Sequence, residues 1–404
     1  MSDDRSILVA ALEGAVTAFR AAHPNPTLLG SGPDRAVLDA LSAAIERCAA
    51  YHAVAGQMVF SGGSGPVLHS GPLASLLFSK GGWPSENVEG AVDWLLKVLR
   101  TRKARALVKA AIWGMQMDQA VTVRRNAQLM PFDTLPDSYM KDRIKARARS
   151  SYDGSAWTAP TYYEQPDAAY VEEVAEFPYI GGDGAAFQRM NDLEERLNDI
   201  VVLLQATVTG RSIAVACWFE YLDHDLEYAE WENAFTWLLP EVHPKVARGA
   251  AVSDAQVQTN IANFDALPPD RRAAILRSME RFRLSQGRRQ GVDRVLDLTL
   301  AFEIAVSGPG GEQSPPSYKV GVRTVQAIGG PLPDRQQRRA TVGDLYKLRN
   351  QATHGGQLKA KEAKALDRIL DDCGAIYLQL MTRLLTIAAE PDWPAIELEA
   401  LSSP

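Results

Sequence analysis

The sequence predicts an α+β protein that is predominantly helical, with a helical bundle in its C-terminal third and a small sheet in its N-terminal region. Apolar residues recur at helical spacing in segments 273–284, 292–302 and 366–384. Short runs of Val, Ile and Trp, broken by polar residues, occupy 106–131 and are typical of strands. The 404 residues, 46% of them hydrophobic, are enough for two or three domains with buried cores.

Composition divides the chain into three predicted parts. Residues 1–155 form a mixed α/β domain of unknown role, which begins with amphipathic helices at 7–19 and 37–48. Residues 156–265 form an acidic, aromatic-rich and mostly helical middle region, and residues 266–392 form the helical domain. The middle region holds most of the acidic excess, since about 16 acidic residues face about 3 basic ones between 161 and 240.

Several classes of protein are excluded by composition. No apolar run approaches the 18 or more residues that a membrane-spanning helix needs, and Met1-Ser2-Asp3-Asp4 is not a signal peptide. Cys48, Cys217 and Cys373 are far apart in apolar surroundings, which predicts reduced, buried thiols. We therefore expect a cytoplasmic protein that has no contact with membranes.

No cofactor or metal is predicted. The loop from Gly62 to Pro66 is rich in glycine but lacks the Gly-Lys-Ser/Thr ending of a phosphate-binding loop. Asp223-His224-Asp225 places a His between two carboxylates, but adjacent side chains diverge on both helices and strands. A solvated acidic loop is the simpler interpretation of that triplet.

The most informative segment is Tyr346-Lys347-Leu348-Arg349-Asn350-Gln351-Ala352-Thr353-His354-Gly355-Gly356. Thr341 and Asp344 are spaced as a capping box, and Gly355 stands where a glycine often ends a helix. These signals predict a helix from about Val342 to His354.

Polar groups gather on one side of that helix. At about 100° per residue, Leu345, Leu348 and Ala352 share an apolar stripe. A neighbouring arc, predicted to lie away from the core, carries the polar set Arg349, Thr353, Tyr346, Asn350 and His354.

This arc suits phosphodiester chemistry. His354 can exchange a proton near neutral pH, and Arg349 can hold two phosphate oxygens in its planar fork. Asn350 can orient either partner, while RNA supplies its own nucleophile, the 2′-OH. The alternative interpretation is a solvated Arg and a His that only ends the helix.

The segment resembles the R-N-x-x-x-H signature of HEPN-domain proteins, helical domains of which many members cleave RNA without a metal. The order of the upstream helices, the motif Asp297-Leu-Thr-Leu-Ala-Phe-Glu303 and the Leu-Tyr and Gly-Gly flanks are similar to the Apea-like HEPN branch, over about residues 268–390. The resemblance implies that Arg349 and His354 are the catalytic pair, that Asn350 assists, and that Glu303 packs or orients the site. Some HEPN toxins carry a Tyr, the target of a partner antitoxin, where this chain has Gly356.

Charge around the motif favours an anionic ligand. Residues 270–349 contain about 15 basic and 8 acidic residues, although the whole chain has a net charge of −6. A merely solvated basic face is the alternative. We assign substrate binding to Tyr346 and Thr353 and to the arginines Arg288, Arg289, Arg335, Arg338 and Arg339.

Three function classes remain open on these observations. The first is a metal-independent endoribonuclease, which the resemblance connects with antiphage defence or stress-induced growth arrest. The others are a non-catalytic HEPN module that binds nucleic acid or nucleotide and mediates assembly, and an interaction protein in which Arg349 and His354 only cap and pack.

Partners follow from the first class. RNA is the expected substrate, and a protein or phage-derived trigger would act through the N-terminal region. One helix face supplies a single Arg and a single His, whereas cleavage needs both proton removal and proton donation. A homodimer, or a larger even assembly, would supply both, and HEPN relatives commonly pair in this way.

Overall fold

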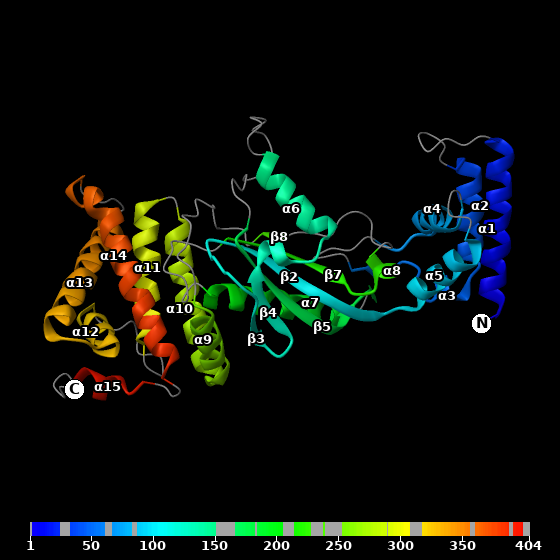
Figure 1. Ribbon diagram of the computed structural model, residues 1–404. Helices are drawn as coiled ribbons and strands as arrows, with labels where there is room; N and C mark the ends of the chain where they lie inside the picture. The colour runs from blue at the N-terminus through cyan, green and yellow to red at the C-terminus, as the bar shows by residue number, and fades with distance from the viewer. Residues whose placement is uncertain are drawn as a thin grey trace. The chain divides into compact units, whose positions relative to one another are not determined.

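The protein is described from a computed structural model and is mostly helical, with antiparallel sheets in its N-terminal region and a helical C-terminal half (Figure 1). The structure describes residues 2–24, 33–60, 67–82, 87–150, 166–181, 184–204, 214–227, 237–238, 253–288, 290–307, 317–355, 360–387 and 391–398. The predicted loop Gly62–Pro66 lies outside these residues. No helix among them is long and apolar enough to cross a membrane.

The chain folds into two compact units, each assembled from separate segments. The first comprises Met1–Lys109, Glu172–Glu194 and Cys217–Trp237, and the second comprises Ala110–Val171, Glu195–Ala216 and Leu238–Pro404. This grouping differs from the three consecutive parts predicted from composition. The reason is that strands formed by distant segments pair with one another, which composition along the chain does not reveal.

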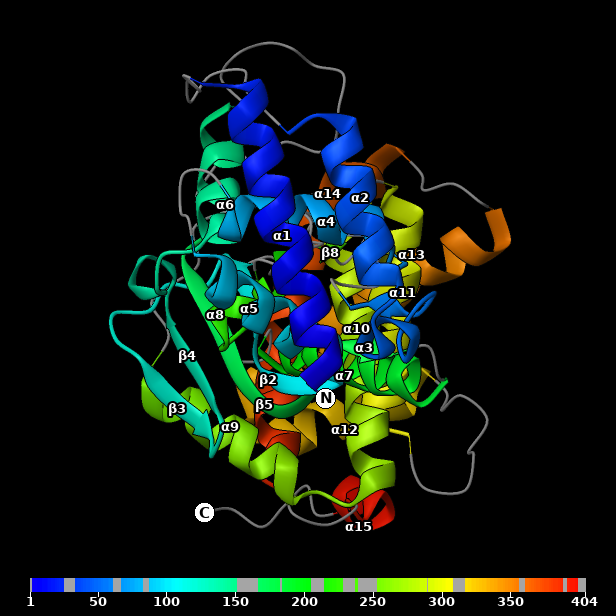
Figure 2. The ribbon, with the colours of Figure 1, turned by 90° about the vertical axis from the view of Figure 1, so that its right-hand side faces the viewer.

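Five helices build most of the first unit. They are α1 (Ser2–Ala22), α2 (Arg35–Glu46), α3 (Ala49–His52), α4 (Ser70–Gly81) and α5 (Val88–Arg100). The predicted helices at 7–19 and 37–48 are confirmed as α1 and α2, which lie side by side in Figure 2. The carboxylate of Asp4 accepts hydrogen bonds from the backbone N–H groups of Ala49 and Ala50 at 2.9 and 3.1 Å, so α1 caps the start of α3.

The main sheet has six strands in the order β3-β4-β5-β2-β7-β8, and a second sheet pairs β1 with β6. The strands are β1 (Met58–Val59), β2 (Lys103–Trp113), β3 (Val121–Arg124), β4 (Ala127–Pro131), β5 (Ala168–Pro178), β6 (Ile180–Gly181), β7 (Ala214–Tyr221) and β8 (Trp237–Leu238). The predicted sheet within 106–131 is confirmed by β2, β3 and β4. Strands β5 and β7 belong to the middle region, which was predicted to be mostly helical.

One 3-10 turn and four α-helices among the described residues complete the regions around these strands. A 3-10 turn η1 (Phe132–Thr134), α6 (Tyr139–Ser150), α7 (Gly184–Leu204), α8 (His224–Glu227) and α9 (Asp254–Ala266) follow in chain order.

The C-terminal part of the second unit is a helical bundle. Its helices are α10 (Pro269–Gly287), α11 (Gly291–Ala305), α12 (Ser317–Ile328), α13 (Leu332–Gly355), α14 (Ala360–Leu385) and α15 (Trp393–Leu398). α13 packs against α11, α12 and α14 (Figure 1). In the core, the ring of Tyr377 stacks on Phe282 with centroids 4.6 Å apart and meets Phe302 edge-on at 5.4 Å. The predicted bundle helices are confirmed by these elements.

The start of α13 differs from the prediction. The helix begins at Leu332, ten residues before Val342, and Thr341 is an interior residue whose Oγ donates to the carbonyl of Gln337 at 3.1 Å. The capping box was therefore a wrong interpretation. Asp334 in the first turn favours the earlier start, and the actual break is made by Gly329 and Gly330, whose φ angles are +77° and +99°.

The prediction of reduced, buried cysteines is confirmed, since Cys48, Cys217 and Cys373 are free and buried. Burial raises the pKa of the Cys48 thiol to about 11 and that of Cys373 to about 12. The Sγ of Cys373 lies 3.4 Å from the carbonyl of Thr341 and packs α14 against α13.

We expect Leu345→Ala to lower the free energy of unfolding by about 2–5 kcal/mol, because Leu345 is fully buried where α13 meets the bundle. Lys347→Ala is the matched control on the same helix. The Lys347 side chain is 76% exposed and, among the described residues, pairs with Asp344 alone, so its loss should cost less than about 0.5 kcal/mol. Urea unfolding measures both, and equal costs would contradict the packing described here.

Candidate functional site

The last two turns of α13 carry the residues of the motif. Arg349 is half-buried, and Asn350 and Thr353 are exposed. The Thr353 hydroxyl donates to the carbonyl of Arg349 at 2.9 Å, so it turns back onto its own helix. His354 belongs to the same helix, one turn after Asn350, but its side chain lies outside what the structure describes. Arg349, Asn350 and the backbone of His354 therefore share one end of α13.

Tyr346 and Glu303 meet beneath this end of the helix. The Tyr346 hydroxyl donates to Glu303 Oε1 at 3.3 Å, and the two residues are only 6% and 7% exposed. Tyr346 thus lies in the interface of α13 with α11, and its predicted place on an arc away from the core was wrong. The reason is that a partner carboxyl on α11 lets the phenol be buried with its hydroxyl satisfied.

Electrostatics at this contact link it to Arg349. Burial, followed by the charge of Glu303, raises the pKa of Tyr346 well above its usual value, and the positive charge of Arg349 opposes that shift. Arg349 therefore lies close enough to the phenol to influence it. Tyr346 stays protonated at neutral pH and acts as a donor toward Glu303, not as a base.

Arg349 has no carboxylate partner among the described residues, unlike five other arginines of the bundle. Those arginines and their carboxylates are Arg281 and Arg288 with Asp297, Arg283 with Glu280, Arg294 with Asp367, and Arg323 with Glu397. A guanidinium that is half-exposed and not neutralised is available to an anionic ligand.

Three of the predicted substrate-binding arginines lie at the other end of α13. Arg335, Arg338 and Arg339 precede Arg349 by 10 to 14 residues, or roughly 15–21 Å along a helix that rises about 1.5 Å per residue. Nη1 of Arg335 donates to Gln326 Oε1 at 2.6 Å, and Nη1 of Arg338 donates to the carbonyl of Gly329 at 2.9 Å. These arginines do not join Arg349 in one pocket.

Arg288 lies on another side of the bundle. Together with Arg281 it holds the two oxygens of the buried Asp297, at 3.2 Å from Arg288 Nε and 3.0 Å from Arg281 Nη1. This ion-pair cluster joins α10 to α11. It neutralises Arg288, which was predicted to bind substrate. Arg289 lies outside the described residues.

No group of side chains that could hold a metal ion occurs in the part of the chain that the structure describes. Asp223 and Asp225, which flank His224, do not stand alone in solvent. Both accept from the ammonium of Lys97, at 2.7 and 2.9 Å respectively. The acidic triplet is thus an ion-paired surface cluster of the first unit, not merely a solvated loop.

Comparison with known proteins adds no assignment. No protein-family model matches the chain, and no curated protein and no solved structure is similar to it.

Sequence reasoning gave no role to Tyr318, the first aromatic residue of α12. Its side chain is 66% exposed, and the guanidinium of Arg339 lies over its ring, 5.1 Å from the centroid. The sequence signal that was available is a Tyr placed directly after a Gly- and Pro-rich loop and about 20 residues before a run of arginines.

The alkaline stability of the protein tests the burial of Tyr346. Its folded pKa is raised, as is that of the fully buried Tyr377, so the unfolded chain loses these protons first, near pH 10. Stability should therefore be complete below pH 10 and fall above it, by up to about 1.4 kcal/mol per pH unit for each tyrosine.

We expect Tyr346→Phe to make this fall less steep in urea unfolding measured between pH 9 and 12. Tyr318→Phe is the matched control, because Tyr318 is exposed and its replacement should leave the slope unchanged. A slope for Tyr346→Phe identical to that of the unmodified protein would show that the phenol ionises freely and is not buried against Glu303.

Proposed function

We propose that this protein is a metal-independent endoribonuclease whose site is formed by Arg349, Asn350 and His354. The observation that supports it most is the half-buried Arg349, which has no carboxylate partner among the described residues and is followed by the exposed Asn350. The helix that carries both groups is anchored from below by the contact between Tyr346 and Glu303. A cation held in this way suits a phosphate group better than a structural role.

The proposed reaction is transfer of the phosphoryl group to the neighbouring hydroxyl. A neutral imidazole of His354 removes the proton of the 2′-OH, and the 2′ oxygen attacks phosphorus as the bond to the 5′ oxygen breaks. A protonated imidazole donates to that leaving oxygen, which yields a 2′,3′-cyclic phosphate and a 5′-hydroxyl. Arg349 stabilises the charge that builds on the non-bridging oxygens, and Asn350 orients the phosphate or the imidazole.

One imidazole cannot be both protonated and neutral in the same step. We therefore propose that two copies of the chain pair through this end of α13, so that one His354 acts as the base and the other as the acid. Two-fold pairing is also the commonest symmetry of homo-oligomers. The two copies of Arg349 would then bind one phosphate from both sides.

A non-catalytic module that binds nucleic acid is the second candidate. Arg338 and Arg339 favour it, since neither has a carboxylate partner among the described residues and both would attract phosphates without any chemistry. The proposed place of the protein in antiphage defence or growth arrest, under the control of a trigger, rests on the HEPN resemblance alone. The proposed cytoplasmic location rests on composition.

The catalytic assignment predicts that His354→Ala and Arg349→Ala each lower the rate of RNA cleavage by on the order of 10² or more. Lys347→Ala is the control, because it removes an exposed charge two residues from Arg349 without touching the proposed site. Cleavage of a labelled RNA should continue in EDTA. Full activity of the His354→Ala protein, or strict dependence on Mg²⁺, would place the chemistry elsewhere.

The two-copy site predicts that inactive subunits poison active ones. Unmodified protein is mixed and re-equilibrated with an excess of the double variant Arg349→Ala/His354→Ala. The activity per unmodified subunit should then fall to a value proportional to the unmodified fraction of the mixture. Mixing with Lys347→Ala should cause no such loss. Activity per subunit that is independent of the mixture, together with a monomer in light scattering, would refute the shared site.

A further inference from the structure

The surface formed by the first turn of α12 and the third turn of α13 has a composition unlike that of the motif end of α13. Tyr318 lies on the first turn of α12 and is the exposed aromatic residue of this surface, at 66%. Arg339, from the third turn of α13, covers part of its ring at 5.1 Å, and Arg338 lies next to Arg339 in the chain. We call Tyr318, Arg338 and Arg339 the α12–α13 platform.

The charge of the platform is not neutralised. Arg338 donates to the carbonyl of Gly329, and Arg339 contacts the face of a neutral ring, so the described residues offer neither arginine a carboxylate. The bond from Arg338 also ties the turn at Gly329 and Gly330 to α13, which holds the two helix ends together. The platform thus presents one guanidinium over an aromatic ring that remains largely open to solvent, and a second guanidinium at the turn where α12 ends.

Exposed aromatic rings flanked by arginines are the elements that bind single-stranded nucleic acid. An unpaired base stacks on the ring, and the guanidinium groups pair with the phosphates on either side. A protein partner would bury the exposed Tyr318 in an apolar contact and would leave both arginine charges to be desolvated. Charge complementarity therefore favours a nucleic acid strand.

We propose that the α12–α13 platform binds single-stranded RNA, with a base stacked on Tyr318 and phosphates on Arg338 and Arg339. The choice of RNA rests on the proposed function. Arg339 precedes Arg349 by ten residues, or roughly 15 Å of helix. At about 3.4 Å per phosphate along a stacked strand, this span corresponds to roughly four or five nucleotides. The platform selects unpaired RNA and holds it at that distance from the phosphate to be cleaved.

Fluorescence anisotropy of a labelled twelve-nucleotide adenine-rich RNA tests the platform, with the full chain carrying His354→Ala to prevent cleavage. Tyr318→Ala should raise the dissociation constant about five- to 150-fold, the change that corresponds to loss of one stacked base. Tyr318→Phe keeps the stacking surface and should bind as before. A twelve-base-pair RNA duplex, whose bases are already stacked, should be insensitive to both substitutions.

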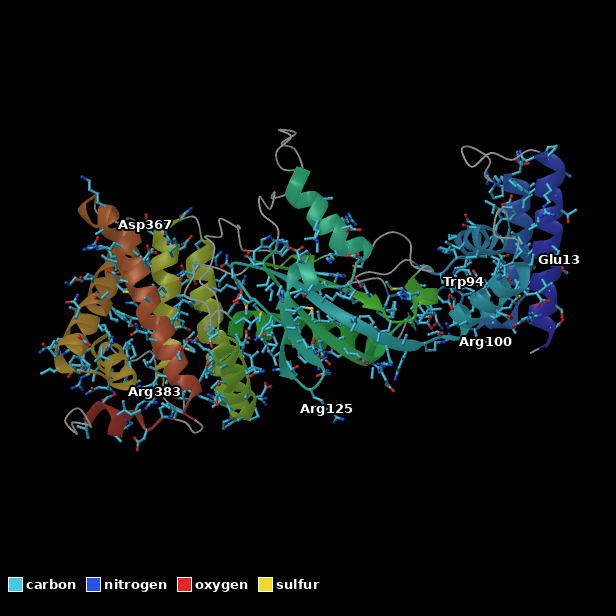
Figure 3. The ribbon with its side chains drawn as sticks, viewed as in Figure 1. Glu13, Trp94, Arg100, Arg125, Asp367 and Arg383 are labelled. Carbon is cyan, nitrogen blue, oxygen red and sulfur yellow. The ribbon has the colours of Figure 1, made fainter. Side chains whose placement is uncertain are left out.

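The salt dependence separates the arginines from the ring. Arg339→Ala should lower the slope of log affinity against log salt concentration by about 0.7, the value for one phosphate contact with a single strand. Tyr318→Ala should leave the slope unchanged. Arg125→Ala is the matched control, since it removes an exposed arginine on the turn between β3 and β4 (Figure 3) and should change neither affinity nor slope.

The outcomes distinguish this inference from the proposed function. If Tyr318→Ala and Arg339→Ala bind RNA as tightly as the parent, or if Tyr318→Ala weakens duplex binding equally, the platform is refuted even where the unmodified protein cleaves RNA. If the RNA is bound as expected but never cleaved, the platform stands and the ribonuclease proposal fails. In an active protein, Tyr318→Ala should raise KM for the twelve-nucleotide RNA and leave cleavage of a trinucleotide, too short to reach the platform, unchanged.

Discussion

The buried contact between Tyr346 on α13 and Glu303 on α11 constrains the whole of the candidate site. A carboxyl and a phenol that are both more than nine-tenths buried must satisfy each other, because an unpaired buried polar group costs about 1–3 kcal/mol. The bond therefore stabilises the rotation and register in which the two helices meet at this point. Arg349, one turn after Tyr346, takes its half-exposed position from that register, as does Asn350 beside it.

The distribution of charge in the bundle depends on which of its arginines form ion pairs with carboxylates. Asp297 holds two arginines of α10, while Arg294 of α11 and Arg323 of α12 have carboxylate partners of their own. These ion pairs join neighbouring helices and leave little net charge for a ligand. On α13, by contrast, Arg338, Arg339 and Arg349 meet a carbonyl, an aromatic ring and solvent. Along α13, the arginines near its start and Arg349 near its end are about 15 Å apart.

Much of this architecture could be predicted from the sequence, and the parts that could not have physical reasons. Periodic apolar residues predicted α10, α11 and α14, because each of these helices buries one continuous stripe. The strands β5 and β7 were missed because they pair with β2 across long stretches of chain. The start of α13 was missed because Thr341 and Asp344 have the spacing of a capping box but lie inside the helix. The residues before Thr341 form helix readily, so the helix extends back to Leu332.

The sequence named the members of the candidate site, but only part of their geometry could be predicted. Periodicity placed Arg349 and Asn350 on one face correctly, since both lie on the partly or fully exposed side of α13. It could not show that Tyr346 turns inward, because that depends on Glu303, which is 43 residues away. A count of arginines likewise could not separate those neutralised by carboxylates, such as Arg288, from those left available, such as Arg339.

The central claim is that the 2′-OH of RNA is the nucleophile of a reaction catalysed without a metal. The most direct measurement uses an RNA whose cleavage position has been mapped and which is then resynthesised with one 2′-O-methyl group at that nucleotide. In EDTA, the account predicts that cleavage at this bond stops, that other cut sites are unaffected, and that the unmodified RNA yields a 2′,3′-cyclic phosphate. Continued cleavage beside the methylated 2′ oxygen, with a linear phosphate end, would contradict it.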